Sequence, residues 1–149
     1  MNDKDWMQQA YEQALVAQSE GEVPVGAVLV DKNNTLVATG RNALENSHDP
    51  SDHAEMRAIR KATQLIKNHR LPDTTLYVTL EPCIMCAGLI VHARIHRLVF
   101  ATRDFKVGAA GSVFNVLQGS PLNHSVQIDE GVLQYECSLL LTDFFKNRR

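Results

Sequence analysis

Hydrophobic and polar positions recur along the chain with two different periods, which predict helices and strands. The apolar residues from Trp6 to Ala17 recur at helical spacing, so a surface helix is expected near the N-terminus, ending at Gly21. The apolar segment "PVGAVLV" (24–30), the turn "DKNN" and the segment "TLVATG" (35–40) predict a hairpin. Because "PVGAVLV" is almost unbroken in its apolar character, its strand is expected to be buried on both faces.

The middle of the chain continues with a helix, a strand, a second helix and a second strand. Apolar residues at helical spacing predict one buried helix face, formed by Ala54, Ala58, Ala62, Leu65 and Ile66. The segment "TLYVTL" (75–80) has a period of two and predicts a strand, and Pro82 is expected in the first turn of a helix that extends to about Val91. The segment "IHRLVFA" (95–101) predicts the next strand. This order predicts a right-handed crossover between two parallel strands.

An amphipathic helix is expected over residues 132–147, and no repeat or linker interrupts the pattern. The alternation of helices and strands predicts an α/β protein with three layers, α/β/α, formed by a single domain over residues 1–149. The length of 149 residues, 44% hydrophobic content and 21% charged content agree with one globular domain.

Composition also limits location and partners. No segment approaches the roughly 18 consecutive apolar residues of a membrane span, and the first residues lack the basic and apolar regions of a signal peptide. A cytoplasmic protein without membrane association is therefore expected. A net charge of -2 and a pI near 6.3 are not typical of a nucleic-acid-binding protein, so any such binding would depend on a local basic patch.

The segment "PCIMC" contains two cysteines, Cys83 and Cys86, three positions apart. They could form a redox pair, half of a structural metal site, or part of a catalytic metal site. The odd count of three cysteines argues against a closed disulfide framework, and the sequence has no second cysteine pair. Cys137 lies on a predicted helix, where a lone cysteine is expected to be a small buried hydrophobe.

A histidine and a glutamate in "HAE" (53–55) provide the missing groups of a catalytic site. His53 and Cys83 are each expected at the beginning of a helix, and two such helix starts can face one point at the edge of a sheet. His53, Cys83 and Cys86 are therefore expected to bind one zinc ion and leave a fourth position open. Glu55 could then transfer protons as general base and general acid. Taken alone, Glu55 would be interpreted as forming a capping box with Asp52. Together, "HAE" and "PCIMC" match every fixed position of the H-x-E and P-C-x-x-C signature of zinc deaminases.

The chain resembles the bacterial tRNA adenosine deaminases. The resemblance covers nearly the whole chain through "VPVGAVLV", "HDP", "HAE", "TLYVTLEPCIMCAG", "GAAGS", "NH" (123–124) and "DFF" (143–145). It implies a cytidine deaminase-like fold with a central mixed sheet of about five strands. It also implies one zinc ion per chain, Glu55 as proton shuttle, a homodimer, and a tRNA anticodon stem-loop whose wobble adenosine is converted to inosine.

The same resemblance implies substrate contacts from Asn42, Asp104 and Asn123. Without it, Asn42 would be interpreted as a turn residue and Asp104 as a solvated loop charge. Asp52 departs from the family, which often has a small apolar residue before the histidine. This carboxylate would either cap the helix or alter the orientation of the ligand.

Three other functions remain open from the sequence: a deaminase of free bases or nucleosides such as cytosine or guanine, a non-catalytic RNA-binding or zinc-stabilised module, and a redox protein. Intact Glu55 argues against the non-catalytic module, and a redox protein would cycle its two cysteines without metal. Basic residues near aromatic ones favour RNA, because cations bind phosphates and aromatic rings stack on bases. These residues are Arg103, Lys106, Lys146, Arg148 and Arg149, with Phe105, Phe144 and Phe145.

Overall fold

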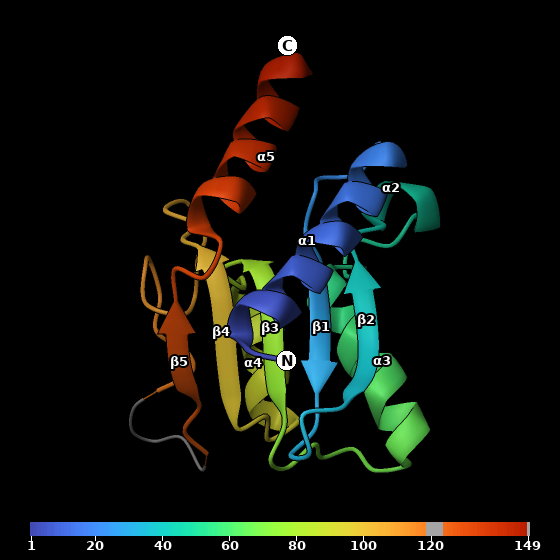
Figure 1. Ribbon diagram of the computed structural model, residues 1–149, viewed down its shortest axis with the longest axis vertical. Coiled ribbons are helices and arrows are strands. Elements are labelled where there is room, and N and C mark those ends of the chain that lie inside the picture. The colour runs from blue at the N-terminus through green and yellow to red at the C-terminus, as the bar shows by residue number, and fades with distance from the viewer. Residues whose placement is uncertain (119–123, 149) are drawn as a thin grey trace.

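The computed structural model describes residues 1–118 and 124–148 and contains a five-stranded mixed sheet (Figure 1). The strands are β1 (Gly26–Val30), β2 (Leu36–Arg41), β3 (Thr75–Leu80), β4 (Arg97–Thr102) and β5 (Gln127–Glu130). Their order across the sheet is β2-β1-β3-β4-β5. Strand β1 is antiparallel to β2 and β3, whereas β3, β4 and β5 are parallel. The predicted hairpin and the predicted parallel crossover are both confirmed.

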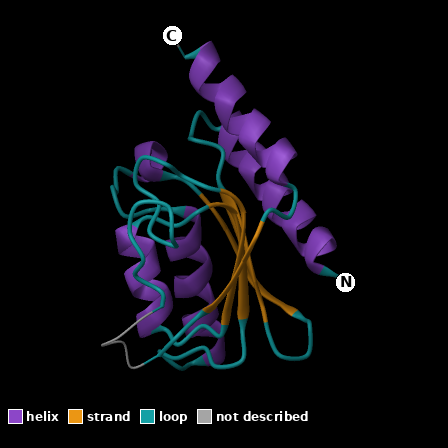
Figure 2. Cartoon of the chain, turned by 90° about the vertical axis from the view of Figure 1, so that its left-hand side faces the viewer, coloured by secondary structure: helices purple, strands orange, loops and turns teal. Residues whose placement is uncertain are grey.

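Helices cover both faces of the sheet, which gives the predicted three layers (Figure 2). The helices are α1 (Asp3–Ser19), α2 (Leu44–Ser47), α3 (Ala54–Ile66), α4 (Ile84–His92) and α5 (Gln134–Asn147). Helices α3 and α4 lie on one face, and α1 and α5 lie on the other (Figures 1 and 2). No helix in the described part of the chain is long and apolar enough to cross a membrane.

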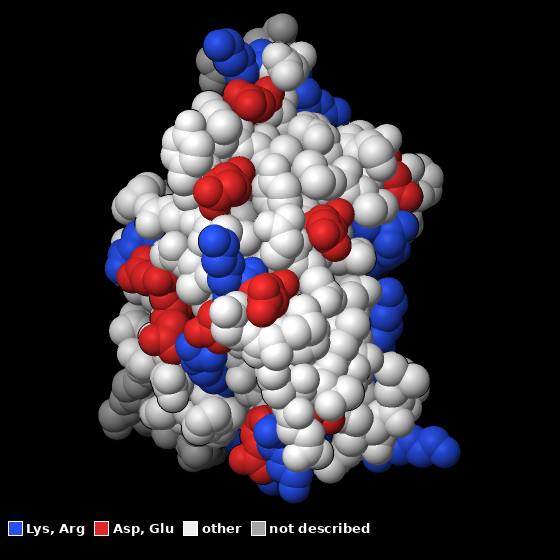
Figure 3. Space-filling model, viewed as in Figure 1, with Lys and Arg blue, Asp and Glu red and all other residues white. Residues whose placement is uncertain are grey.

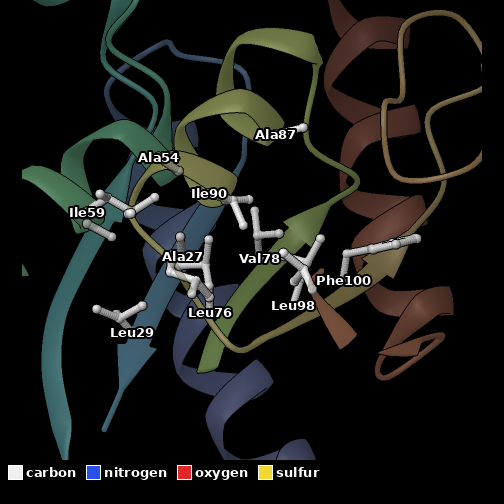
Figure 4. Close-up of a cluster of buried hydrophobic side chains, with 14 of the residues drawn as sticks. Ala27, Leu29, Ala54, Ile59, Leu76, Val78, Ala87, Ile90, Leu98 and Phe100 are labelled. Carbon is white, nitrogen blue, oxygen red and sulfur yellow. The ribbon is translucent and has the colours of Figure 1, made fainter. Parts of the chain in front are cut away.

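The main core lies between the sheet and the layer formed by α3 and α4 (Figure 4). Strand β1 is buried along its whole length, as its apolar sequence predicts. Side chains from all three central strands meet those of α3 and α4, including Leu29, Leu76, Phe100, Ile59 and Ile90. The close-packed core therefore fixes α3 and α4 on the sheet, and it also fixes the residues at the beginning of each helix.

A glycine in β2 allows the start of α3 to approach the sheet closely. A Cβ atom on Gly40 would lie 2.2 Å from the carbonyl oxygen of Ala54 and 2.8 Å from the backbone nitrogen of Ala58. Any larger residue at position 40 would push the first turn of α3 away from β2. This close packing fixes the residues at the beginning of α3, where His53 and Glu55 lie.

Four details differ from the sequence-based expectations. Leu65 and Ile66 are 69% and 44% exposed, because they lie in the last turn of α3 beside the edge strand β2. Pro82 precedes helix α4, which begins only at Ile84. The short helix α2 lies in a segment expected to be a loop. The position of strand β5 was not predicted, although about five strands were expected.

Charged side chains are mixed on the face that α1 and α5 cover. Figure 3 shows Lys and Arg interspersed with Asp and Glu over the described part of this face, without a broad basic surface. This distribution agrees with the small net charge of the chain.

Candidate active site

His53 and Cys83 occupy equivalent positions at the starts of two neighbouring helices. His53 is the N-cap residue of α3 and Cys83 is the N-cap residue of α4, both with extended backbone. Neither side chain makes a capping hydrogen bond. Both are therefore available to face a common point above the sheet.

The structure brings the three predicted ligands together. The Nδ1 atom of His53 lies 3.8 Å from Sγ of Cys83 and 3.5 Å from Sγ of Cys86. The three ligand atoms all lie within 4.8 Å of one another. In a tetrahedral zinc site, Zn–S and Zn–N bond lengths place neighbouring ligand atoms about 3.6–3.8 Å apart. The donor types and their spacing thus fit a metal ion of this kind.

The pKa values of the two cysteine thiols are shifted in opposite directions. The hydrogen bond from Cys86, followed by the one from His53, lowers the pKa of Cys83 to about 3. The same bond to Cys83, together with burial, raises the pKa of Cys86 far above its usual range. The bond with Cys83 also raises the pKa of His53. Cys83 is therefore the more readily formed thiolate, and metal binding would deprotonate the second.

Glu55 is the second residue of α3, and its side chain is buried beside the cysteines. The residue is only 4% exposed, and burial raises the pKa of its carboxyl group. Within residues 1–118 and 124–148, no N–H or O–H group of another residue donates a hydrogen bond to it. A buried carboxyl group without such donors favours the neutral form and can hold a proton.

The capping-box interpretation of Glu55 is wrong. The N-cap residue of α3 is His53 and not Asp52, and the His53 side chain makes no capping hydrogen bond. The Asp52 carboxylate instead accepts a hydrogen bond from Nε of Arg57 at 2.9 Å, and this bond lowers the pKa of Asp52. Asp52 therefore pairs with the side of α3 and does not cap its start.

The three predicted substrate contacts have different positions. Asn42 follows β2 and is 8% exposed, and its Oδ1 atom accepts a hydrogen bond from the N–H of Ala54 at 2.9 Å. Asn42 thus lies directly beside the "HAE" segment. Asp104 lies in the loop after β4, where its Oδ1 atom accepts hydrogen bonds from the backbone of Lys106 and Val107. Asn123 lies outside the described residues.

The predicted aromatic residues near the C-terminus differ in exposure. Phe105 and Phe145 are 77% and 50% exposed, and they line an open groove of about 560 Å³ between α5 and the loop after β4. Phe144 is one of the buried residues of α5, so its ring is not available for stacking on an RNA base.

Two of the predicted basic residues have partners within the chain. Arg103 makes two hydrogen bonds to Glu130, at 2.8 and 2.7 Å. Arg148 lies 3.7 Å from a carboxylate oxygen of Glu45, and its guanidinium lies 5.0 Å from the Phe144 ring centroid. These carboxylates would compete with RNA phosphates for the two arginines.

Two buried glutamates near the site were missed by sequence reasoning. Glu22 and Glu81 are 2% and 3% exposed; Glu22 accepts several hydrogen bonds from helix α2, and Glu81 accepts several from the loop after β4. Burial acts to raise their pKa values, but the hydrogen bonds outweigh burial and both pKa values lie below the usual range. Their signal in the sequence is an acidic residue beside an apolar strand, in "EVPVG" and "TLEPC".

The sequence matches the MafB19-like deaminase family over residues 1–149. It is 48% identical over 147 residues to the tRNA-specific adenosine deaminase of Haemophilus influenzae, covering 99% of this chain and 85% of that protein. It is 42% identical over 147 residues to the protein of the same name from Bacillus subtilis, covering 99% and 91%.

Solved structures give the same picture of the fold. A structure from a study of A-to-I editing by tRNA:A34 deaminases has a TM-score of 0.88 at 36% identity, covering 92% of this chain and 99% of that one. A guanine deaminase from Nitrosomonas europaea has a TM-score of 0.83 at 21% identity, covering 95% and 83%. The second likeness concerns the fold alone.

Proposed function

The chain belongs to the MafB19-like deaminase family, together with the tRNA-specific adenosine deaminases, and from this premise we propose that it converts the wobble adenosine of a tRNA anticodon loop to inosine. The reaction exchanges the amino group at C6 of adenine for oxygen from water. A C–O bond forms, the C–N bond breaks, and ammonia leaves. The observation that carries this proposal is the buried carboxyl group of Glu55 beside three converging metal-ligand atoms.

In this proposal His53, Cys83 and Cys86 hold one zinc ion through Nδ1 and the two Sγ atoms. Two thiolates and an imidazole favour zinc because of their softness and its preference for four ligands. A bound zinc ion would supply Lewis acidity, which lowers the pKa of water so that it can attack near neutral pH. Three protein ligands would leave room for that water, whereas a structural zinc site usually has four.

Glu55 is proposed to transfer protons during the reaction. Its carboxyl group is buried and has a raised pKa, because burial outweighs the hydrogen bonds from its own backbone N–H and from the Cys86 thiol. It can therefore take one proton from the attacking water and give it to the ring nitrogen, then take the second proton from the new hydroxyl group at C6 and give it to the amino group, which leaves as ammonia. A pKa nearer to the working pH makes both directions of transfer accessible.

The substrate is proposed to be a loop base because such a base is already partly unstacked. Moving it outward costs less than the few kcal/mol needed to flip a base from a duplex. Asn42 and Asp104 are proposed to contact the target nucleotide and its neighbour, since Asn42 lies against α3 and Asp104 lies at the groove lined by Phe105. The contact from Asn123, the homodimer and the cytoplasmic location stay predictions.

The proposal is tested by incubating the zinc-loaded protein with total tRNA and, separately, with adenosine, cytosine, cytidine and guanine. Inosine reads as guanosine on sequencing, and ammonia release reports deamination of the small molecules. We expect a conversion confined to the wobble adenosine of an anticodon loop, with no ammonia from the free compounds. Unedited tRNA with ammonia from cytosine or guanine would replace this proposal by a small-molecule deaminase.

A further inference from the structure

Glu81 lies between the end of β3 and the beginning of α4. It follows Leu80, the last residue of β3, and precedes the N-cap residue Cys83 by two positions. The residue is 3% exposed, although a carboxylate is costly to bury. Its surroundings must therefore offset that cost.

Within the described residues, the hydrogen bonds to the Glu81 carboxylate all come from one loop, residues 104–112. Oε1 accepts the backbone N–H of Asp104 at 3.0 Å and the hydroxyl of Ser112. Oε2 accepts the backbone N–H groups of Ala110 at 2.9 Å and Ser112 at 3.1 Å. Both ends of the loop are thus held by one side chain.

Gly108 lets this loop close over the carboxylate. A Cβ atom at position 108 would lie 2.4 Å from Cδ of Glu81 and 2.5 Å from its Oε1 atom. The adjacent Ala109 donates its N–H to the carbonyl oxygen of Pro82 at 2.8 Å, so the backbone of the loop also contacts the segment that leads to Cys83. The loop and the cysteine segment form one connected unit.

We propose that Glu81 is a positioning residue that holds the RNA-binding loop at a fixed place relative to Cys83. The inference rests on the proposed function, in which Asp104 on this loop contacts the substrate. Glu81 itself contacts neither zinc nor RNA. By holding Asp104 through its backbone N–H, it aligns the nucleotide-binding groups with the metal ligands.

The test compares Glu81→Gln and Gly108→Ala with the wild type, all loaded with zinc. In Glu81→Gln, the amide NH2 group would face the N–H and O–H donors of the loop. In Gly108→Ala, the added methyl group would displace the loop without changing Glu81. We expect both variants to keep one zinc per chain and a nearly unchanged kcat. Their KM for an anticodon stem-loop should rise by about 10-fold, because losing contacts that are equally strong in the ground state and the transition state raises KM and leaves kcat unchanged.

Asp3→Asn is the matched control. Asp3 accepts hydrogen bonds from Tyr77 at 2.6 Å and from Arg97 at 2.9 and 2.7 Å, at the opposite end of β3 and β4. This variant should lose stability without a change in KM. If Glu81→Gln does not fold, Ser112→Ala removes one bond to the same carboxylate and should raise KM by a smaller factor.

The two proposals fail in different ways. A wild-type protein that edits no tRNA would refute the proposed function. Wild-type editing combined with an unchanged KM in Gly108→Ala and Ser112→Ala would refute the positioning role alone. A loss of zinc in Glu81→Gln would also refute it, because the residue would then support the metal ligands.

Discussion

Glu55 and Glu22 are both almost fully buried, but their surroundings are opposite. They are 4% and 2% exposed, respectively. Glu22 accepts hydrogen bonds from the backbone of Glu45 at 3.2 Å, and from the backbone and side chain of Asn46 at 2.8 and 2.6 Å. Glu55 receives no N–H or O–H donor from other residues within the described part of the chain. The pKa of Glu22 is lowered, whereas that of Glu55 is raised.

The difference shows that burial of a carboxylate does not by itself indicate catalysis. Hydrogen bonds to Glu22 offset the cost of burying its charge, so this residue can serve to hold the segment that includes α2. Glu81 belongs to the same class. The hydrogen bonds to Glu55, from its own backbone N–H and the Cys86 thiol, do not outweigh burial. A perturbed carboxyl group beside potential metal ligands is typical of a functional site. The first three predictions below test this distinction, and the fourth tests which cysteines belong to the metal-ligand group.

The largest effect is expected for Glu55→Gln. The amide preserves the shape of the side chain but cannot take up a proton, so turnover should fall by about 10²-fold or more. Affinity for the anticodon stem-loop should remain. Single-turnover inosine formation at saturating RNA measures the first effect, and an RNA titration measures the second. Near wild-type turnover in this variant would make Glu55 a structural residue like Glu22.

For Glu22→Gln we expect the opposite result. The new amide group would face N–H donors, which lowers the free energy of unfolding by about 1–3 kcal/mol. The kcat for RNA should be unchanged. Urea unfolding of the zinc-loaded protein gives the stability, and Glu12→Gln at an exposed position is the control, with a change within about 0.5 kcal/mol. Loss of kcat at unchanged stability would place Glu22 in the active site.

The contribution of Glu22 should depend on pH. Its pKa is lower in the folded protein than its usual value of 4.5, so its ionised form is favoured by folding. This stabilisation is fully present above pH 4.5 and is lost as pH falls toward the lower folded-state pKa. The stability difference between wild type and Glu22→Gln, measured by unfolding at a series of pH values, should therefore shrink below pH 4.5. If the difference in the free energy of unfolding stayed constant down to pH 3, hydrogen bonding to the ionised Glu22 carboxylate would not be the source of the stabilisation.

The smallest effect is expected for Cys137→Ser. Burial raises the pKa of Cys137 to about 12, but it is not part of the metal-ligand group. The substitution should lower stability by about 1 kcal/mol and leave both the zinc content and kcat unchanged. Elemental analysis against protein concentration checks the zinc content. A fall in zinc content would mean that Cys137 acts on the metal site.

The metal-ligand group could be predicted because its residues lie at element boundaries. His53 and Cys83 directly precede helices whose apolar periodicity is visible in the sequence, and Cys86 follows at a fixed spacing. Their convergence then depends only on two helices packing on the same face of the sheet. The resemblance to known deaminases supplied the role of Asn42, which spacing alone does not indicate.

Other features depend on contacts between distant segments and could not be predicted. The hydrogen-bond donors to Glu22 and Glu81 lie 23 to 31 residues away, in helix α2 and in the loop after β4, so the sequence around the two glutamates does not indicate their partners. The exposure of Leu65 follows from its place beside the edge strand β2, which is set by strand order. Asp52 has a capping pattern with Glu55, but the competing bond to Arg57 prevails.

The most direct test of the account is a zinc titration of the metal-free protein, with inosine formation in an anticodon stem-loop measured at each step. The account predicts that inosine formation rises with added zinc and saturates at one equivalent per chain. Glu55→Gln should take up the same single equivalent and form almost no inosine. Inosine formation without zinc would contradict the role of the metal. Failure of Glu55→Gln to take up zinc would contradict the assignment of metal binding to the three ligands and of proton transfer to Glu55.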